Sequence, residues 1–246
     1  MEISIELVPR SIEQLTSELN LLKEFRTEIT RVNIPDLPRL QFRSYEVTET
    51  VAGFSYPVIP HIRACDFDLS GPLPFDKVLP AGSDGILIVK GDPPKDDSYK
   101  CYDTTSIELC GAIKKSNPSA DLYGVIDPYR GIEAEYLYIE EKISAGFDGF
   151  FTNPFFDLEL MRDFIQPLLG RGLKIYVGIC PVVSERSKAY WERTNNVIFP
   201  EDFEPTLEWN VVLAKKIMAF CEENGLDLYL MPIKIDLEKY LNGLFL

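Results

Sequence analysis

The 246-residue chain is poor in the residues that build metal centres and disulfide frameworks. It has one histidine, His61, and a zinc site would need more nitrogen or sulfur donors than can be placed beside it. Its cysteines are odd in number, widely spaced and without a Cys-x-x-Cys pair: Cys65, Cys101, Cys110, Cys180 and Cys221. We therefore predict reduced thiols, a cytoplasmic location and no metal site.

Basic clusters, long apolar runs and flexible linkers are also lacking. Lysine and arginine number 25 against 39 acidic residues, so the net charge of −14 repels nucleic acid and anionic lipid, and we expect neither as a partner. No apolar run approaches the ~20 residues that cross a bilayer. The start, MEISIELVPR, has no signal-peptide pattern. Because no Gly-, Ser- or Pro-rich linker divides the chain, we predict one domain over residues 1–246.

What the sequence does contain is a regular alternation of short apolar strands and amphipathic helices. The expected strands are 3–7, 28–34, 57–64, the apolar run after Asp84, 121–126, 148–152, 173–179 and 226–231. The expected helices are 12–25, 42–53, 74–79, 103–116, 133–145, 156–169, 184–193, 206–224 and 237–244. Such alternation predicts an α/β protein with a parallel sheet.

Eight such units in about 250 residues are the expected size of a (β/α)₈ TIM barrel. A doubly wound open sheet is the alternative. It usually carries a glycine-rich loop after its first strand, and Leu7-Val8-Pro9-Arg10 is nothing like one.

Polar side chains follow the carboxyl ends of the predicted strands, which is where ligands bind in barrels. Lys90 and Asp92 come directly after a buried strand, and the prolines behind them take the chain out of the sheet. The whole set that a barrel would bring to one mouth is Glu6, Asn33, Asp36, His61, Arg63, Asp66, Lys90, Asp92, Asp127, Thr152, Asn153 and Lys234.

Glu6 stands out because it lies within an otherwise apolar strand. A carboxylate inside a barrel must be paired, solvated or protonated. One interpretation is an ion pair with Arg10 or Arg63, and the other is an acid whose pKa is raised by burial so that it can donate a proton near neutral pH. A lone histidine is usually a structural hydrogen-bonding group, and a lysine on a helix, such as Lys142, is usually solvated.

Six segments, in the order of the chain, resemble those of methylenetetrahydrofolate reductases. They are residues 5–10 (IELVPR), 32–36 (VNIPD), 60–66 (PHIRACD), 90–94 (KGDPP), 142–148 with 152–157 (KISAGFD and TNPFFD), and 178–182 (GICPV). The resemblance covers nearly the whole chain and implies a (β/α)₈ barrel, in agreement with the strand pattern.

The resemblance also implies an oxidoreductase of one-carbon metabolism and methionine biosynthesis. This flavoprotein would use FAD, and NAD(P)H or another reductant, to reduce 5,10-methylenetetrahydrofolate or a related C1-pterin to the 5-methyl form. Glu6 matches the general acid that protonates the folate nitrogen as the ring opens, and Asp92 matches the carboxylate that stabilises the resulting cation. The remaining matches are cofactor contacts at Asn33, His61, Lys90, Gly91, Asp127 and Lys142, and substrate contacts at Thr152, Asn153 and Lys234.

The chain departs from the family after the fifth predicted strand. Where the family has a Tyr-Pro-Glu-x-His segment, this chain has Asp127-Pro128-Tyr129-Arg130-Gly131. We therefore expect weak or altered flavin binding, with FMN or no flavin as alternatives and with Tyr129 and Arg130 as substitute contacts.

Three functional hypotheses remain open at this point. The first is the reductase. The second is a folate-binding or C1/methyl-transfer protein on the same barrel, such as a subunit of a larger reductase or of a corrinoid-linked methyl carrier system. For protein partners, the alternatives are a second copy of the chain in a homo-oligomer and a partner reductase subunit. The third is a lyase that uses Lys90 as a Schiff base.

Overall fold

The computed structural model describes residues 1–93 and 99–246, and within them eight parallel strands form a closed barrel. Each strand pairs with the next along the chain, and β8 closes the ring by pairing with β1. The strands are β1 (Ile3–Glu6), β2 (Arg31–Ile34), β3 (Val58–Arg63), β4 (Ile86–Val89), β5 (Leu122–Ile126), β6 (Gly149–Pro154), β7 (Lys174–Ile179) and β8 (Asp227–Leu230). The prediction of a (β/α)₈ TIM barrel is confirmed.

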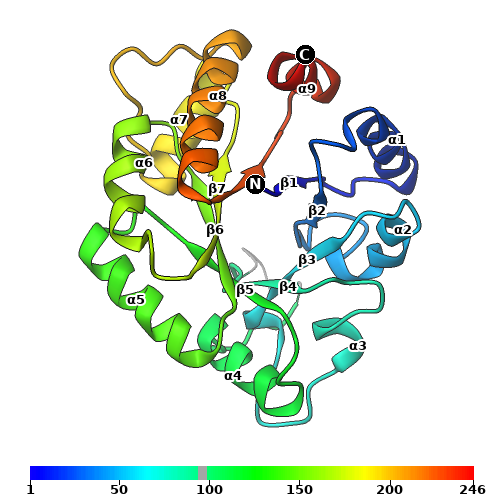
Figure 1. Cartoon of the computed structure of the whole chain (residues 1–246). Helices are drawn as coiled ribbons and strands as arrows, with labels where there is room; N and C mark the ends of the chain where they lie inside the picture. Colours follow the sequence, from blue (N-terminus) through cyan, green and yellow to red (C-terminus); the bar gives the residue numbers. More distant parts are fainter. Residues whose placement is uncertain (94–98) are drawn as a thin grey trace.

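Helices surround the strands (Figure 1). The α-helices are α1 (Ile12–Leu22), α2 (Thr48–Ala52), α3 (Phe75–Val78), α4 (Ser106–Ser116), α5 (Ile132–Ala145), α6 (Leu158–Ile165), α7 (Glu185–Asn195), α8 (Leu207–Asn224) and α9 (Leu237–Phe245). Short 3₁₀ turns lie at Lys23–Phe25 (η1), Ser44–Glu46 (η2), Ala64–Asp66 (η3) and Gln166–Leu168 (η4). Over the described ranges, no helix combines the length and apolar character needed to cross a bilayer.

Most of the expected elements lie within two residues of their observed bounds when the 3₁₀ turns that continue α1 and α6 are included, and three differ by more. The helix expected at 103–116 begins at Ser106, because Thr105 forms a capping box with Glu108. The strand expected at 28–34 begins at Arg31, because the amides of Glu28 and Ile29 both bond to the Phe25 carbonyl. The helix expected at 42–53 is reduced to η2 and the five residues of α2.

The barrel has an apolar layer on each side of its strands, as expected for parallel strands buried on both faces. Alternate strand residues pack outward against the helices. Inside the barrel, Phe151 stacks on Tyr176 with ring centroids 4.2 Å apart and meets Tyr229 edge-on at 5.0 Å. These side chains, with Ile59 and Leu87, fill the interior, so room for a ligand lies at the mouth formed by the strand ends.

One irregularity, a bulge in β6, shapes that mouth. The register between β6 and β7 shifts between Phe151 and Pro154. The Thr152 Oγ1 accepts a hydrogen bond from the Gly178 amide at 2.8 Å, in place of a carbonyl of the ladder. Gly178 is required here, because a Cβ would lie 2.4 Å from the Thr152 carbonyl oxygen.

Candidate active site

Glu6 lies at the end of β1 on the inner face of the barrel. Its partner is Tyr229 of β8, whose phenol donates a short hydrogen bond to Glu6 Oε2. Burial raises the pKa of Glu6 to about 7, although this hydrogen bond lowers it in part. Neither Arg10 nor Arg63 forms the ion pair with Glu6 that was one of the two expectations, and among the described residues the partner is a neutral phenol. Glu6 can therefore carry a proton near neutral pH.

Beside Glu6, on the next two strands, Asn33 and His61 form a buried polar pair. Asn33 is the register partner of Glu6, and its Oδ1 accepts a hydrogen bond from the Ser4 hydroxyl at 2.6 Å. The Asn33 amide nitrogen lies 3.3 Å from His61 Nε2. Because that nitrogen is a donor, Nε2 accepts and the proton of the neutral ring lies on Nδ1. Burial lowers the pKa of His61 to about 3, so the imidazole remains uncharged.

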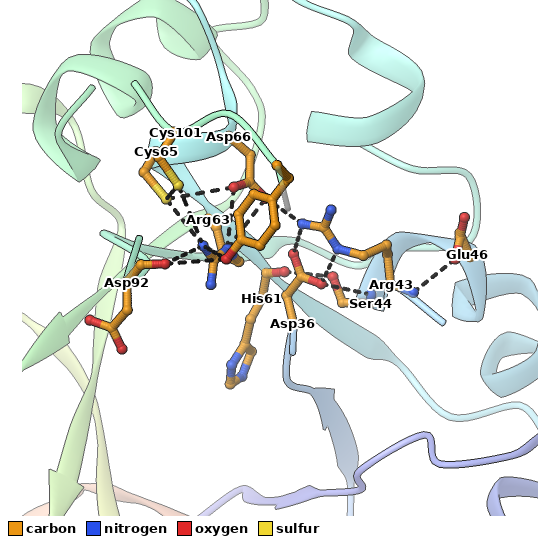
Figure 2. Close-up of polar contacts among 11 residues, drawn as sticks. Asp36, Arg43, Ser44, Glu46, His61, Arg63, Cys65, Asp66, Asp92 and Cys101 are labelled. Atoms are coloured by element: carbon orange, nitrogen blue, oxygen red, sulfur yellow. Dashed lines mark hydrogen bonds and ion pairs between the residues drawn. The ribbon is translucent and has the colours of Figure 1, made fainter. Parts of the chain in front are cut away.

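At the rim above His61, two arginines and two aspartates form a continuous network (Figure 2). Arg43 binds Asp36 through two hydrogen bonds, at 2.7 and 2.5 Å, and also binds Asp66. Arg63, at the end of β3, contacts Asp66 at 3.3 Å and donates to the main-chain carbonyl of Asp92 at 2.6 Å. The network therefore ties the segment after β4 to the ends of β2 and β3.

Lys90, Gly91 and Asp92 stand at the rim after β4, where the sequence predicts them, and Lys90 and Asp92 are exposed. The Asp92 carboxylate points away from Arg63, whereas its carbonyl faces the guanidinium (Figure 2). Gly91 adopts a φ of 80°, and a Cβ there would lie 2.6 Å from the Cys65 sulfur. Pro94, the last residue of the motif, lies outside the described residues.

The segment after β5 builds a charged cluster outside the barrel interior. Asp127 donates its amide to Glu135 at 3.0 Å, and Glu135 is fully buried. Arg130 lies 3.1 Å from one oxygen of Glu135, and the Lys142 ammonium lies 3.6 Å from the other. Lys142 is not solvated, because it is only 3% exposed and also donates to the Val125 carbonyl. Burial lowers the pKa of Lys142 to about 8.

The predicted substrate residues lie on β6 and after β8. Thr152 is buried and engaged in the bulge, whereas Asn153 is only partly buried at the strand end. Lys234, in the left-handed conformation with φ 57°, lines a cavity of about 110 Å³ together with Glu6, Arg10, Gln14 and Glu18. A larger hollow of about 600 Å³ between the 69–75 segment and α4 is lined by no strand residue, so it lies outside the mouth.

Sequence reasoning did not identify three residues of this site. Tyr229 lies in an apolar strand, Ser4 lies two positions before Glu6 on the same inward face of β1, and Arg43 directly precedes η2. The period of two along β1 could have indicated Ser4. The pairing of Tyr229 with Glu6 spans 223 positions and depends on closure of the barrel.

Comparison with known proteins decides the family. The sequence profile of methylenetetrahydrofolate reductase matches residues 57–216, which is more than half of the chain. The chain belongs to the methylenetetrahydrofolate reductase family. Its matched region includes the strand ends that carry His61, Arg63, Asp92 and Thr152. No curated protein matches the chain.

Solved structures share the fold of this family member. A protein from Clostridium thermocellum, described as uncharacterised and as binding two copies of 5-methyl-5,6,7,8-tetrahydrofolic acid, is similar with a TM-score of 0.69 and 16% identity, over 99% of this chain and 92% of that chain. Dihydropteroate synthase from Thermus thermophilus is similar with a TM-score of 0.53 and 14% identity, over 99% and 90%. A 2,3-dimethylmalate lyase is similar with a TM-score of 0.51 and 14% identity, over 99% and 89%.

Proposed function

We propose that this protein binds a C1-substituted tetrahydrofolate at the barrel mouth and reduces the 5,10-methylene form to the 5-methyl form, with Glu6 as the proton donor. Membership of the methylenetetrahydrofolate reductase family supports the reaction class. The observation that carries the proposal is the environment of Glu6, because a buried carboxyl with a pKa of about 7 is matched to proton transfer near neutral pH.

The arrangement around Glu6 suggests how the proton is held. Tyr229 donates to Oε2, so Oε1 is the oxygen that carries a proton toward the substrate. Glu6 then gives this proton to the folate nitrogen that is released when the imidazolidine ring opens. The ring carbon becomes part of a cationic iminium, and the exposed carboxylate of Asp92 at the same mouth stabilises that charge.

A flavin, which the family implies, supplies the hydride chemistry when it is bound. The residues present fit such a group in part. Lys90 and Arg130 are exposed cations after the neighbouring strands β4 and β5, where they would hold its phosphates, next to the predicted contacts Gly91 and Asp127. Lys142 is enclosed between Glu135 and the Val125 carbonyl, so we propose that it supports the β5 rim from behind.

The test separates binding from turnover. Glu6→Gln keeps the size and the hydrogen-bonding capacity of the side chain but cannot supply the proton, so this variant retains affinity for 5-methyltetrahydrofolate and loses at least about 100-fold in methylenetetrahydrofolate reduction. Calorimetry measures the binding, and NAD(P)H oxidation with added FAD measures the reduction. Glu133→Gln, an exposed position on α5, is the matched control. Full activity of Glu6→Gln would refute the assignment.

Binding of a folate without reduction is the second candidate function. The similar Clostridium thermocellum protein is described by its bound methyltetrahydrofolate alone, and the burial of Lys142 beside Glu135 supports a cofactor seat that differs from the family pattern. A C1/methyl-transfer or carrier subunit would bind 5-methyltetrahydrofolate by calorimetry, yet show no flavin absorbance shift on titration with FAD or FMN and no NAD(P)H oxidation.

The same measurements address the lyase hypothesis. A Schiff base at Lys90 would be trapped by borohydride in the presence of a carbonyl substrate and lost in Lys90→Arg. Among the described residues, no characteristic catalytic partner contacts the Lys90 side chain, and the Lys90 main-chain carbonyl accepts from the Cys65 amide at 3.0 Å. We therefore favour the folate functions.

A further inference from the structure

The two thiols behind the Arg63 network lie unusually close together. The Cys101 thiol donates to the Cys65 sulfur at a distance of 3.5 Å, although both cysteines are free. The main chains are adjacent as well, since the Tyr102 amide donates to the Cys65 carbonyl at 2.7 Å. The two sulfurs therefore need to approach by only about 1.5 Å to reach the ~2.05 Å length of a disulfide bond. Figure 2 shows the two sulfur atoms side by side, next to the Asp66 carboxylate and above the Arg63 guanidinium.

We propose that Cys65 and Cys101 are a redox-active pair that forms a disulfide across the rim of the barrel when a small-molecule disulfide, such as oxidised glutathione, is the oxidant. The pair joins the turn after β3 to the segment that precedes α4. The loop that it would close, residues 66–100, contains Lys90, Gly91 and Asp92.

The surroundings of the two sulfurs give them different parts in the reaction. Cys101 is partly exposed and Cys65 is buried, so the oxidant meets Cys101 first. The Arg63 guanidinium lies 3.3 Å from the Cys65 sulfur and 4.0 Å from the Cys101 sulfur, so a cation is in place beside the negative charge that develops on Cys65 as it reacts. Burial raises the pKa of Cys65 to about 12, which keeps that thiol protonated until it reacts.

The exchange balances without any other reactant. The Cys101 thiolate attacks one sulfur of the oxidant, which releases one small thiol and leaves a mixed disulfide. Cys65, whose thiol donates to Asp66 Oδ1 at 3.6 Å, then attacks the Cys101 sulfur as its proton passes to the departing small thiolate. The second small thiol leaves. Two cysteine thiols have been oxidised to one disulfide, and one small disulfide has been reduced to two thiols.

The same three donors, Cys65, Asp66 and Cys101, lie within 4.8 Å of one another and could be considered as metal ligands. The Arg63 guanidinium argues against that, because its positive charge lies at hydrogen-bond distance from two of the three ligand atoms. A cation in contact with the ligands favours thiolate chemistry and opposes a divalent ion. The redox assignment is therefore the one we test.

Thiol counting and peptide mapping test the pair directly. Fully reduced protein has five thiols, and incubation with oxidised glutathione leaves three in denatured protein if the pair reacts. Trypsin then yields a disulfide-linked pair of peptides, 64–77 and 101–114. Because peptide 101–114 also contains Cys110, the Cys110→Ala variant is the control. It should still lose two thiols and give the same linked pair.

The variants define which results overturn the proposal. Cys101→Ser should keep all of its four thiols, and the wild-type cross-link should raise Tm by about 5–10 °C, because it closes a long loop. Five thiols remaining in the wild type, or a stable mixed disulfide with glutathione, would overturn the proposal. Stoichiometric Zn²⁺ that is retained by the wild type and lost in Cys101→Ser would replace it with a metal site.

A second readout rests on the proposed folate function. Because the cross-link fixes the segment that carries Asp92, we expect oxidation to change the Kd for 5-methyltetrahydrofolate at least about threefold in the wild type and leave it unchanged in Cys101→Ser. If the disulfide forms and the Kd does not change, the pair does not control the site. If neither redox state binds the folate, the proposed function fails while the thiol count still establishes the disulfide.

Discussion

At the scale of single residues, Glu6 shows how the fold can raise the pKa of a carboxyl group. The side chain emerges from an apolar strand into the top of a packed interior, and its nearest polar partner is the uncharged phenol of Tyr229. No cation among the described residues compensates the carboxylate there, so burial favours the protonated form. This arrangement has a consequence for stability that can be measured without any substrate.

The pKa of Glu6 rises from 4.5 to about 7 on folding, so the folded state binds more protons than the unfolded state between these values. The contribution of Glu6 to the free energy of unfolding must then fall by about 3 kcal/mol as pH rises through this window. Below and above the window this contribution is constant. Glu6→Gln removes that loss. Urea unfolding at pH 5 and pH 8 should show a smaller decrease for Glu6→Gln than for the wild type or Glu133→Gln. Equal decreases in all three would show that Glu6 is not perturbed.

The sequence predicts Glu6 as a special position but leaves its partner undecided. Glu6 does have a partner, as expected for a carboxylate in an apolar strand. That partner is Tyr229 and not Arg10 or Arg63, the two residues that the sequence suggested. Arg63 is instead engaged by Asp66, Tyr99 and the Asp92 carbonyl. Such competition between possible partners is settled by three-dimensional distances, which the order of residues does not contain.

At the scale of elements, the β6 bulge links a predicted substrate residue to the architecture of the sheet. The Thr152 hydroxyl replaces a carbonyl as the acceptor for the Gly178 amide, and both residues are buried between β6 and β7. A bulge was not predictable here, because strand periodicity assumes regular pairing. If this hydrogen bond holds the bulge, then removing the Thr152 hydroxyl should destabilise the protein.

Thr152→Val preserves the shape of the side chain but leaves the buried Gly178 amide without an acceptor, so we expect a loss of about 1–3 kcal/mol in the free energy of unfolding. Thr152→Ser keeps the hydroxyl and should lose less. Chemical denaturation of both variants measures the difference. If the valine variant is as stable as the serine variant, then the hydroxyl does not hold the bulge.

The ion pair between Lys142 and Glu135 in the β5–α5 unit leads to a second prediction, which also tests whether Lys142 contacts the cofactor. Lys142→Met removes a buried cation beside Glu135 and should destabilise the protein by about 3 kcal/mol, because a buried carboxylate loses a partner. The double variant Glu135→Leu/Lys142→Met should recover part of that loss. Denaturation and FAD titration are measured together. A Lys142→Met protein with unchanged stability and lost flavin binding would show that Lys142 is a direct cofactor contact.

The same unit illustrates why helices are easier to predict than the contacts they carry. The helical spacing of apolar residues in α5, together with the glycine that follows it, predicts the helix from the sequence alone. Gly146 does end the helix, in the left-handed conformation. The burial of Lys142 is not readable in this way. It follows from a lysine stem long enough to run along the strand–helix layer toward Glu135.

At the scale of the whole molecule, the barrel ties the two ends of the chain together. The Leu228 amide donates to the Glu2 carbonyl at 2.9 Å, and the Glu2 amide donates to Asp227 at 2.7 Å. The rings of Phe25 and Phe245 lie 6.1 Å apart, so the segment after α1 packs on the last helix, α9. The alternation of elements along the chain anticipates this closure, because eight parallel units complete a ring.

A closed ring predicts that residues 1–246 unfold as one domain. Removing β8 would expose the edges of both β1 and β7, so neither half of the barrel retains a complete sheet. Fluorescence of Trp191 and Trp209 reports on α7 and α8, whereas far-UV circular dichroism reports on all elements. In urea the two signals should give one coincident transition, with the same midpoint and the same m-value. Separate midpoints would mean that the C-terminal part of the barrel opens on its own, and the chain would then comprise more than one cooperative unit.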